Sequence, residues 1–114
     1  MIEIRYYQSA DGRRPFTEWL QALQDQQAGA RIRIRLDRLA LGSFGDCEPI
    51  DGGVIELRIH WGPGYRVYCA RLGQAIVLLL CGGDKTTQKK DIKRAKDYFE
   101  DYKTRTKKKP RSRS

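Results

Sequence analysis

The chain has 114 residues, of which 39% are hydrophobic and 32% are charged, so it has the size and composition of one globular domain. No run approaches about 18 apolar residues, the length that a membrane-spanning helix requires, so we expect no such segment. Residues 1–5 lack the charged-then-apolar layout of a signal peptide. We therefore expect a cytoplasmic protein.

The net charge of +9 is concentrated at the C-terminus. Residues 103–114 carry seven positive charges and no acidic residue, whereas the other 102 residues hold 16 basic and 14 acidic groups. We expect a single domain over residues 1–102. Residues 103–114 form a basic tail that attracts polyanions and is either disordered or an extension of the last helix. Any case for nucleic-acid binding by the body must rest on how its charges are arranged.

The cysteines do not indicate a metal or redox site. Cys47, Cys69 and Cys81 are odd in number, their spacing matches no zinc pattern, and two of them lie in apolar runs. We interpret them as small buried hydrophobic residues, and we predict neither a metal nor a cofactor.

The N-terminal third predicts a strand followed by two helices. Residues 2–6 alternate between apolar and other side chains, as in a half-buried strand. Pro15 suits the first turn of a helix. Residues 28–41 fit both a strand and a helix, but their length and Gly42 after them favour a helix. We therefore predict a helical hairpin over 15–25 and 28–41.

The rest of the chain predicts strands and a final helix. Residues 75–81 are apolar at every position, as in a central strand covered on both faces. Thr86 or Thr87 is the predicted cap of the last helix. The element order is β-α-α-β-β-β-β-α, which is an α+β fold. The predicted strands in this half cover residues 47–50, 54–60, 65–71 and 75–81.

Arg58 and Lys85 are the first candidates for chemistry on a phosphate. Arg58 lies on the polar face of a strand, where a guanidinium can hold a phosphate through two hydrogen bonds. The alternative is an ion pair with Glu56 or another carboxylate. Lys85 follows an apolar strand and precedes a helix, and Gly82-Gly83 before it permits close backbone approach. A lysine there would stabilise charge developing on phosphate oxygens.

Four residues on either side of the turn Gly62-Pro63-Gly64 are further candidates. His60 is the only histidine and the natural general base, although a lone histidine before a turn is often an ordinary surface residue. Arg66 and Tyr68 fall on one face of the following strand and Tyr65 on the other. The tyrosines either stack on bases or pack the helical hairpin against the sheet.

Basic residues on the predicted helices are candidates for the walls of a nucleic-acid groove. The alternative is that they are solvated helix faces. Gln88 is a candidate positioning group at the start of the last helix. The basic candidates are Arg31, Arg35 and Arg38 on the second helix, and Lys89 and Lys93 on the last.

Two blocks carry a family resemblance: Gly62-Pro63-Gly64-Tyr65-Arg66-Val67-Tyr68, and Gly82-Gly83-Asp84-Lys85-Thr86-Thr87-Gln88. Together with residues 53–59, they make the chain resemble the phage-derived Gp49-like, HigB-type branch of the RelE/ParE toxin superfamily. The likeness runs from residue 2 to about residue 100 and leaves out the basic tail.

The resemblance implies the toxin of a type II toxin–antitoxin pair, with a RelE-like, antiparallel-rich sheet, the helical hairpin on one face and a C-terminal helix. Members of the HigB and RelE types cleave mRNA, usually on the ribosome, by attack of a ribose 2′-hydroxyl on the adjacent phosphate and without a metal. By position, Arg58 and Lys85 would stabilise the phosphate, whereas Tyr65, Arg66 and Tyr68 would position the substrate or support the structure.

The resemblance also implies partners. They are a helix-turn-helix antitoxin of the HigA or Xre type, the ribosome with its mRNA, and operator DNA only through the antitoxin; no membrane is involved. Two alternatives stay open. The first is a ParE-like inhibitor of DNA gyrase that cuts no RNA, and the second is a nucleic-acid-binding module without catalysis.

Overall fold

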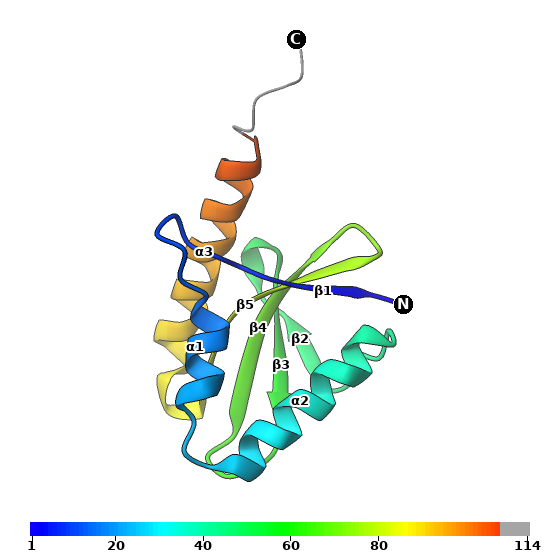
Figure 1. Ribbon diagram of the computed structural model, residues 1–114, viewed down its shortest axis with the longest axis vertical. Helices are drawn as coiled ribbons and strands as arrows, with labels where there is room; N and C mark the ends of the chain where they lie inside the picture. Colours follow the sequence, from blue (N-terminus) through cyan, green and yellow to red (C-terminus); the bar gives the residue numbers. More distant parts are fainter. Residues whose placement is uncertain (108–114) are drawn as a thin grey trace.

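The protein is built on one mixed five-stranded sheet with helices on both faces (Figure 1). The computed structural model describes residues 1–107. The strand order is β1-β5-β4-β3-β2, in which β1 is parallel to β5 and the other three pairings are antiparallel. This arrangement confirms the predicted α+β class and the antiparallel-rich sheet.

The N-terminal elements are a short edge strand and the predicted helical hairpin. β1 covers Glu3–Tyr6, α1 covers Pro15–Ala22 and α2 covers Gln26–Ala40. Pro15 opens α1 as expected. The Asp25 carboxylate caps α2 by accepting hydrogen bonds from the backbone N–H groups of Gln27 and Ala28. The helix reading of the ambiguous arginine-rich segment is therefore confirmed.

The remaining strands form a meander that ends in α3. The strands are β2 (Cys47–Pro49), β3 (Val54–Ile59), β4 (Tyr65–Leu72) and β5 (Ile76–Asp84), and α3 covers Gln88–Lys107. A register shift between β4 and β5 follows Tyr68, which pairs with Cys81, whereas Cys69 pairs with Leu79. Leu80 and Cys81 therefore both face α3, although they are neighbours in one strand. From Cys81 onward, each residue of β5 faces the side opposite to the one that regular alternation would give it.

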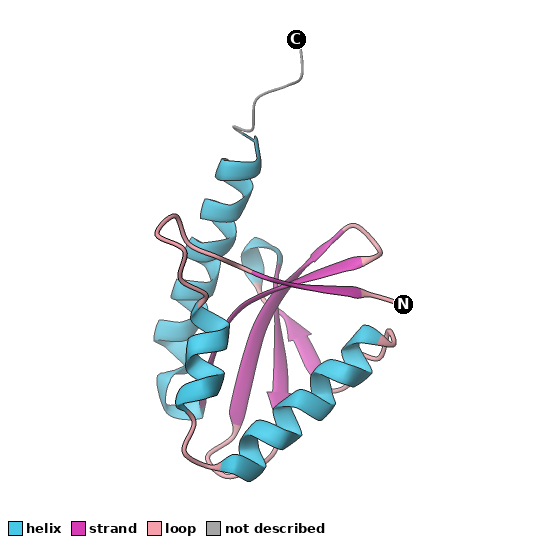
Figure 2. Cartoon of the chain, in the orientation of Figure 1, coloured by secondary structure: helices cyan, strands magenta, loops and turns pink. Residues whose placement is uncertain are grey.

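Helices cover both faces of the sheet (Figure 2), and each face has its own core. The α1–α2 hairpin packs on one face, where Phe16 and Ile32 meet Leu57 and Val67. On the other face, α3 packs its Phe99 and Ala95 against Tyr68, Leu78 and Leu80. Because Val77 and Leu78 in β5 belong to opposite cores, the strand is covered on both faces, as its continuous apolar run predicts.

The start of the C-terminal helix differs from the sequence expectation, because a short 3₁₀ turn, Lys85–Thr87, precedes α3 and is capped by Asp84. The Asp84 carboxylate accepts a hydrogen bond from the Thr86 N–H at 2.8 Å, and the Thr87 hydroxyl accepts one from the Asp84 N–H at 3.4 Å. α3 continues past residue 102 to Lys107, so the helix extension that we gave as one alternative is present in the first part of the basic segment. The rest of that segment, residues 108–114, lies outside the described residues. No helix in residues 1–107 combines the length and apolar character needed to cross a membrane.

Candidate functional site

Three of the predicted catalytic residues line one pocket at an end of the sheet. His60, Arg66 and Lys85 surround the turn between β3 and β4, and Trp61 and residues 62–64 complete the lining. The pocket therefore brings together the two sequence blocks that carry the family resemblance.

Strand register explains why residues so far apart in the chain meet there. Arg66 on β4 pairs with Arg58 on β3 and with Gly83 on β5. Lys85 leaves β5 at the same end of the sheet, because Asp84 pairs with Tyr65. A Cβ built on Gly64, which has φ of +85°, would lie 3.6 Å from Arg66 Nη1 and 3.7 Å from Lys85 Cβ. The turn thus passes directly beside both cations.

The Arg66 guanidinium is buried but poorly satisfied. The residue is only 9% exposed, and its Nε forms no hydrogen bond within the described residues. Nε lies 3.8 Å from Glu56 Oε2, which is in range for an ion pair but too far for a hydrogen bond, and Nη1 lies 3.5 Å from the carbonyl oxygen of Tyr65. Buried N–H groups normally form hydrogen bonds. Because Arg66 Nε forms none among the described residues, the guanidinium has a donor free to bind an anion.

Lys85 differs from Arg66 in its surroundings. Its side chain is exposed, and no carboxylate in residues 1–107 forms an ion pair with it. The pocket thus pairs a buried cation with an exposed one. This combination suits a phosphate that is held by the first and neutralised by the second.

Glu56 organises the polar residues beside the pocket and was not among the predicted site residues. It is 2% exposed, and its Oε2 accepts hydrogen bonds from Gln88 Nε2 at 2.7 Å and from the Tyr68 hydroxyl at 3.2 Å. Its Oε1 accepts one from Arg58 Nε at 3.3 Å. We call these four residues the Glu56 network. Its sequence signal was a carboxylate between apolar residues in a strand, two positions before an arginine.

Arg58 is engaged by carboxylates on three sides. Besides Glu56, its guanidinium forms ion pairs with Asp46 at 3.5 Å and with Glu48. The side chain is 28% exposed. The ion pair that the sequence left open as the alternative for Arg58 is therefore present, so a phosphate would have to compete with these carboxylates.

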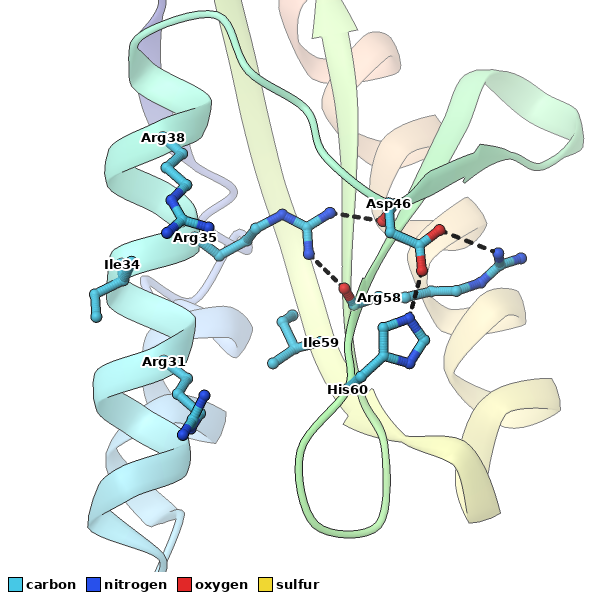
Figure 3. A pocket seen from close by; sticks show the side chains of 8 residues that line it. All are labelled: Arg31, Ile34, Arg35, Arg38, Asp46, Arg58, Ile59 and His60. Atoms are coloured by element: carbon cyan, nitrogen blue, oxygen red, sulfur yellow. Dashed lines mark hydrogen bonds and ion pairs between the residues drawn. The ribbon is translucent and has the colours of Figure 1, made fainter.

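A second pocket lies on the other side of His60, between α2 and β3. Figure 3 shows Arg35 reaching from α2 toward Asp46 and the carbonyl oxygen of Arg58, while the side chain of Arg58 points away from α2. Arg35 donates to the carbonyl oxygens of Phe44 at 2.7 Å and Asp46 at 2.6 Å, and also to that of Arg58. Burial lowers the pKa of Arg35. Arg35 thus holds the loop before β2, whereas Arg31 and Arg38 line the pocket.

His60 borders both pockets and is held by Asp46. Its Nε2 lies 2.5 Å from Asp46 Oδ2, and its side chain is exposed. The hydrogen bond from His60 lowers the pKa of Asp46, and the charge of Arg58 lowers it further. A carboxylate bound to an imidazole fixes the ring orientation, as in many acid–base sites.

The two tyrosines of β4 are core residues. Tyr65 packs against Trp19 of α1 with ring centroids 6.2 Å apart, and Tyr68 is fully buried on the α3 side. Burial raises the pKa of Tyr68, and the neighbouring Glu56 raises it further. Arg66 and Tyr68 share a face, as predicted. Tyr65 therefore packs the helical hairpin against the sheet, as in the alternative, whereas Tyr68 packs against α3 instead.

Gly82 and Gly83 are needed for packing between elements. A Cβ on Gly82 would overlap the Trp19 ring, and one on Gly83 would overlap the Asp91 carboxylate of α3. We predicted that these glycines let another group come close to the backbone. The groups that do so are the side chains of Trp19 and Asp91.

The remaining candidates lie on the outer side of α3 or in the core. Lys89 is exposed, and Lys93 forms an exposed ion pair with Asp97 at 3.5 Å. Cys69 and Cys81 are buried, and burial raises the pKa of each thiol to about 12. Among residues 1–107, no group of three His, Cys, Asp or Glu side chains is arranged to hold a metal ion.

Together, the fold and the pocket define a small α+β protein with a cationic pocket at one end of its sheet. Residues 18–100 match the model of the phage-derived Gp49-like protein family, and the chain belongs to that family. An uncharacterized protein of Haemophilus influenzae is 51% identical over 81 residues, which are 71% of this chain and 82% of the relative. The family match includes all the residues of the pocket.

Proposed function

We propose that this protein is the toxin of a type II toxin–antitoxin pair, of the RelE/ParE superfamily and HigB type, and that it cleaves mRNA on the ribosome without a metal. The observation that carries the proposal is the juxtaposition of two cations in one pocket: Arg66, which is buried, and Lys85, which is exposed. Within residues 1–107, Arg66 Nε has no hydrogen-bond partner and Lys85 forms no ion pair. Membership in the phage-derived Gp49-like family supports it.

The proposed reaction is an in-line displacement at phosphorus. The ribose 2′-hydroxyl gives its proton to a base and its oxygen attacks the adjacent phosphate. The bond to the 5′-oxygen of the next nucleotide breaks, and that oxygen takes a proton from solvent water. The products are a 2′,3′-cyclic phosphate and a 5′-hydroxyl. Arg66 orients the phosphate, and Lys85 offsets the negative charge that grows on its oxygens in the transition state.

His60 is the proposed proton acceptor. It borders the pocket, and Asp46 at 2.5 Å orients its imidazole. Arg58 and Gln88 support the site through the Glu56 network rather than by direct contact with the phosphate. A cytoplasmic location and a helix-turn-helix antitoxin that brings the toxin to operator DNA are part of this proposal.

Primer extension on a reporter mRNA tests the proposal, after a brief pulse of expression in bacteria. Two messages are compared, one translatable and one without its start codon. Cuts confined to the translated message are expected. Cuts in both would indicate a ribonuclease that acts without the ribosome. An intact message with growth arrest would favour gyrase as the target, and an intact message with normal growth would favour a binding module.

A further inference from the structure

The outer flank of α2 carries a stripe of alternating cations and exposed aliphatic side chains. Arg31, Ile34 and Arg38 follow at spacings of three and four residues, which places them on one side of α2. Leu41 comes directly after the end of the helix at Ala40. Ile34 is 50% exposed and Leu41 is 71% exposed, and both are among the large hydrophobic residues that the described surface leaves open. We call these four residues the α2 stripe.

The cations of the α2 stripe lack acidic partners. No carboxylate in residues 1–107 forms an ion pair with Arg31 or Arg38, whereas Arg13, Lys96 and Arg105 elsewhere on the surface are paired. Arg31 is instead held over the ring of Trp61, with its guanidinium carbon 3.8 Å from the ring centroid. The stacking fixes one cation at the edge of the stripe in a defined position.

The α2 stripe also borders a hollow. Arg31, Ile34 and Arg38 line the pocket between α2 and β3, and His60 forms part of its opposite wall (Figure 3). A helix lying along the stripe would therefore lie beside this pocket.

We propose that the α2 stripe is the docking surface for an acidic amphipathic helix of another protein. Carboxylates of that helix pair with Arg31 and Arg38, and its apolar side chains cover Ile34 and Leu41. A nucleic acid would use the two arginines but would leave the two exposed aliphatic side chains uncovered, so the composition favours a protein. The inference rests on this surface alone and holds whether or not the chain cleaves RNA.

A binding experiment with defined probes tests it. The probes are a synthetic peptide with Glu and Leu on one helical face, a shuffled peptide of the same composition, and a short single-stranded RNA. Binding to the full-length protein is measured by fluorescence anisotropy of the labelled probes. The expected result is saturable binding of the amphipathic peptide and markedly weaker binding of the shuffled one.

Variants then locate the site. Arg31→Glu with Arg38→Glu is expected to weaken peptide binding at least about 10-fold through charge repulsion. Ile34→Ser is expected to weaken it about 5-fold through lost apolar burial. The matched control is Arg33→Glu on another flank of the same helix, which should change it less than about twofold. These residues are exposed, and melting curves verify that each variant is folded.

Three results would overturn the inference. The first is equal binding of the shuffled peptide or an equal effect of Arg33→Glu, because either would reduce the interaction to general charge. The second is RNA binding that depends on Arg31 and Arg38 without peptide binding, which would assign the surface to nucleic acid. The third is the absence of saturable peptide binding.

Discussion

Glu56 shows how one buried carboxylate supports a cationic site. It is nearly inaccessible, yet it binds side chains from β3, β4 and the start of α3, so it ties these elements together at the edge of the pocket. A buried charge is stable only when it is paired and hydrogen-bonded. Removing it leaves Arg58 without one carboxylate and the buried Tyr68 hydroxyl without an acceptor.

Glu56→Ala is therefore expected to lower the free energy of unfolding by about 3 kcal/mol, because it breaks a buried ion pair and orphans its partners. Glu48→Ala is the matched control, since Glu48 also pairs with Arg58 but is exposed. That change should cost less than about 1 kcal/mol. Urea unfolding of both variants measures the difference. Equal small losses would show that the Glu56 network does not stabilise the fold.

At the scale of residues, alternation along a strand predicted which face each side chain occupies but not what it meets there. Arg66 and Tyr68 share a face, as predicted, and that face is closed by α3. The partners of Arg58 come from β2, from the preceding loop and from its own strand. Local sequence patterns carry no information about neighbours that are distant in the chain. The sequence therefore could not decide whether Arg58 binds a phosphate or forms an ion pair with carboxylates.

At the scale of elements, the glycine pair at the end of β5 sets the distance between the sheet and its two helical layers. The register shift after Tyr68 turns Gly82 toward Trp19 of α1 and Gly83 toward Asp91 of α3. Asp91 is itself buried and accepts a hydrogen bond from the Thr87 hydroxyl at 2.5 Å. The start of α3, and with it Lys85, is positioned by this contact.

Gly83→Ala is expected to destabilise the fold by about 2 kcal/mol, because the added methyl group forces Asp91 and α3 away from the sheet. Gly29→Ala is the matched control. Its Cβ would meet only the flexible end of Arg33, at 3.1 Å, and alanine favours a helix, so stability should stay unchanged or rise by up to about 1 kcal/mol. Thermal melting compares the two, and similar effects would argue against close packing at Gly83.

The last turn of α3 gives a second prediction for an element. Residues 103–107 are exposed, and Arg105 there pairs with Asp101 at 2.9 Å and donates to the carbonyl oxygen of Gln8. Within the described part of the chain, deleting residues 103–114 removes these surface contacts but no core residue. The free energy of unfolding is therefore expected to fall by less than about 1 kcal/mol. A larger loss in urea unfolding would give the basic segment a structural role.

Element types and their order followed from the sequence, whereas contacts between elements did not. Helical spacing and Gly42 were enough to choose a helix for the arginine-rich segment, and the continuous apolar run marked β5 as a strand covered on both faces. The start of α3 was misplaced because a 3₁₀ turn, capped by Asp84 and Thr87, precedes it, and such a turn has no distinct sequence signal. Arg35 was predicted on a basic stripe but turns inward, because its donors satisfy the carbonyl oxygens of a loop.

At the scale of the whole molecule, His60 lies between two pockets that are surrounded by different kinds of side chain. The pocket with Arg66 and Lys85 presents cations to an anion, whereas the α2 stripe adds exposed aliphatic side chains to its cations. We expect chemistry on one side and protein contact on the other. His60 borders both pockets, so it lies between the proposed catalytic pocket and the α2 stripe.

The most direct test of the central claim is Lys85→Ala. Lys85 is exposed and unpaired among residues 1–107, so its removal should leave the melting temperature unchanged while mRNA cleavage falls by about 100-fold or more and growth arrest is lost. Lys90→Ala removes another exposed lysine of the same segment and should stay toxic. A stable Lys85→Ala variant that still cleaves mRNA and arrests growth would contradict the assigned role of the pocket.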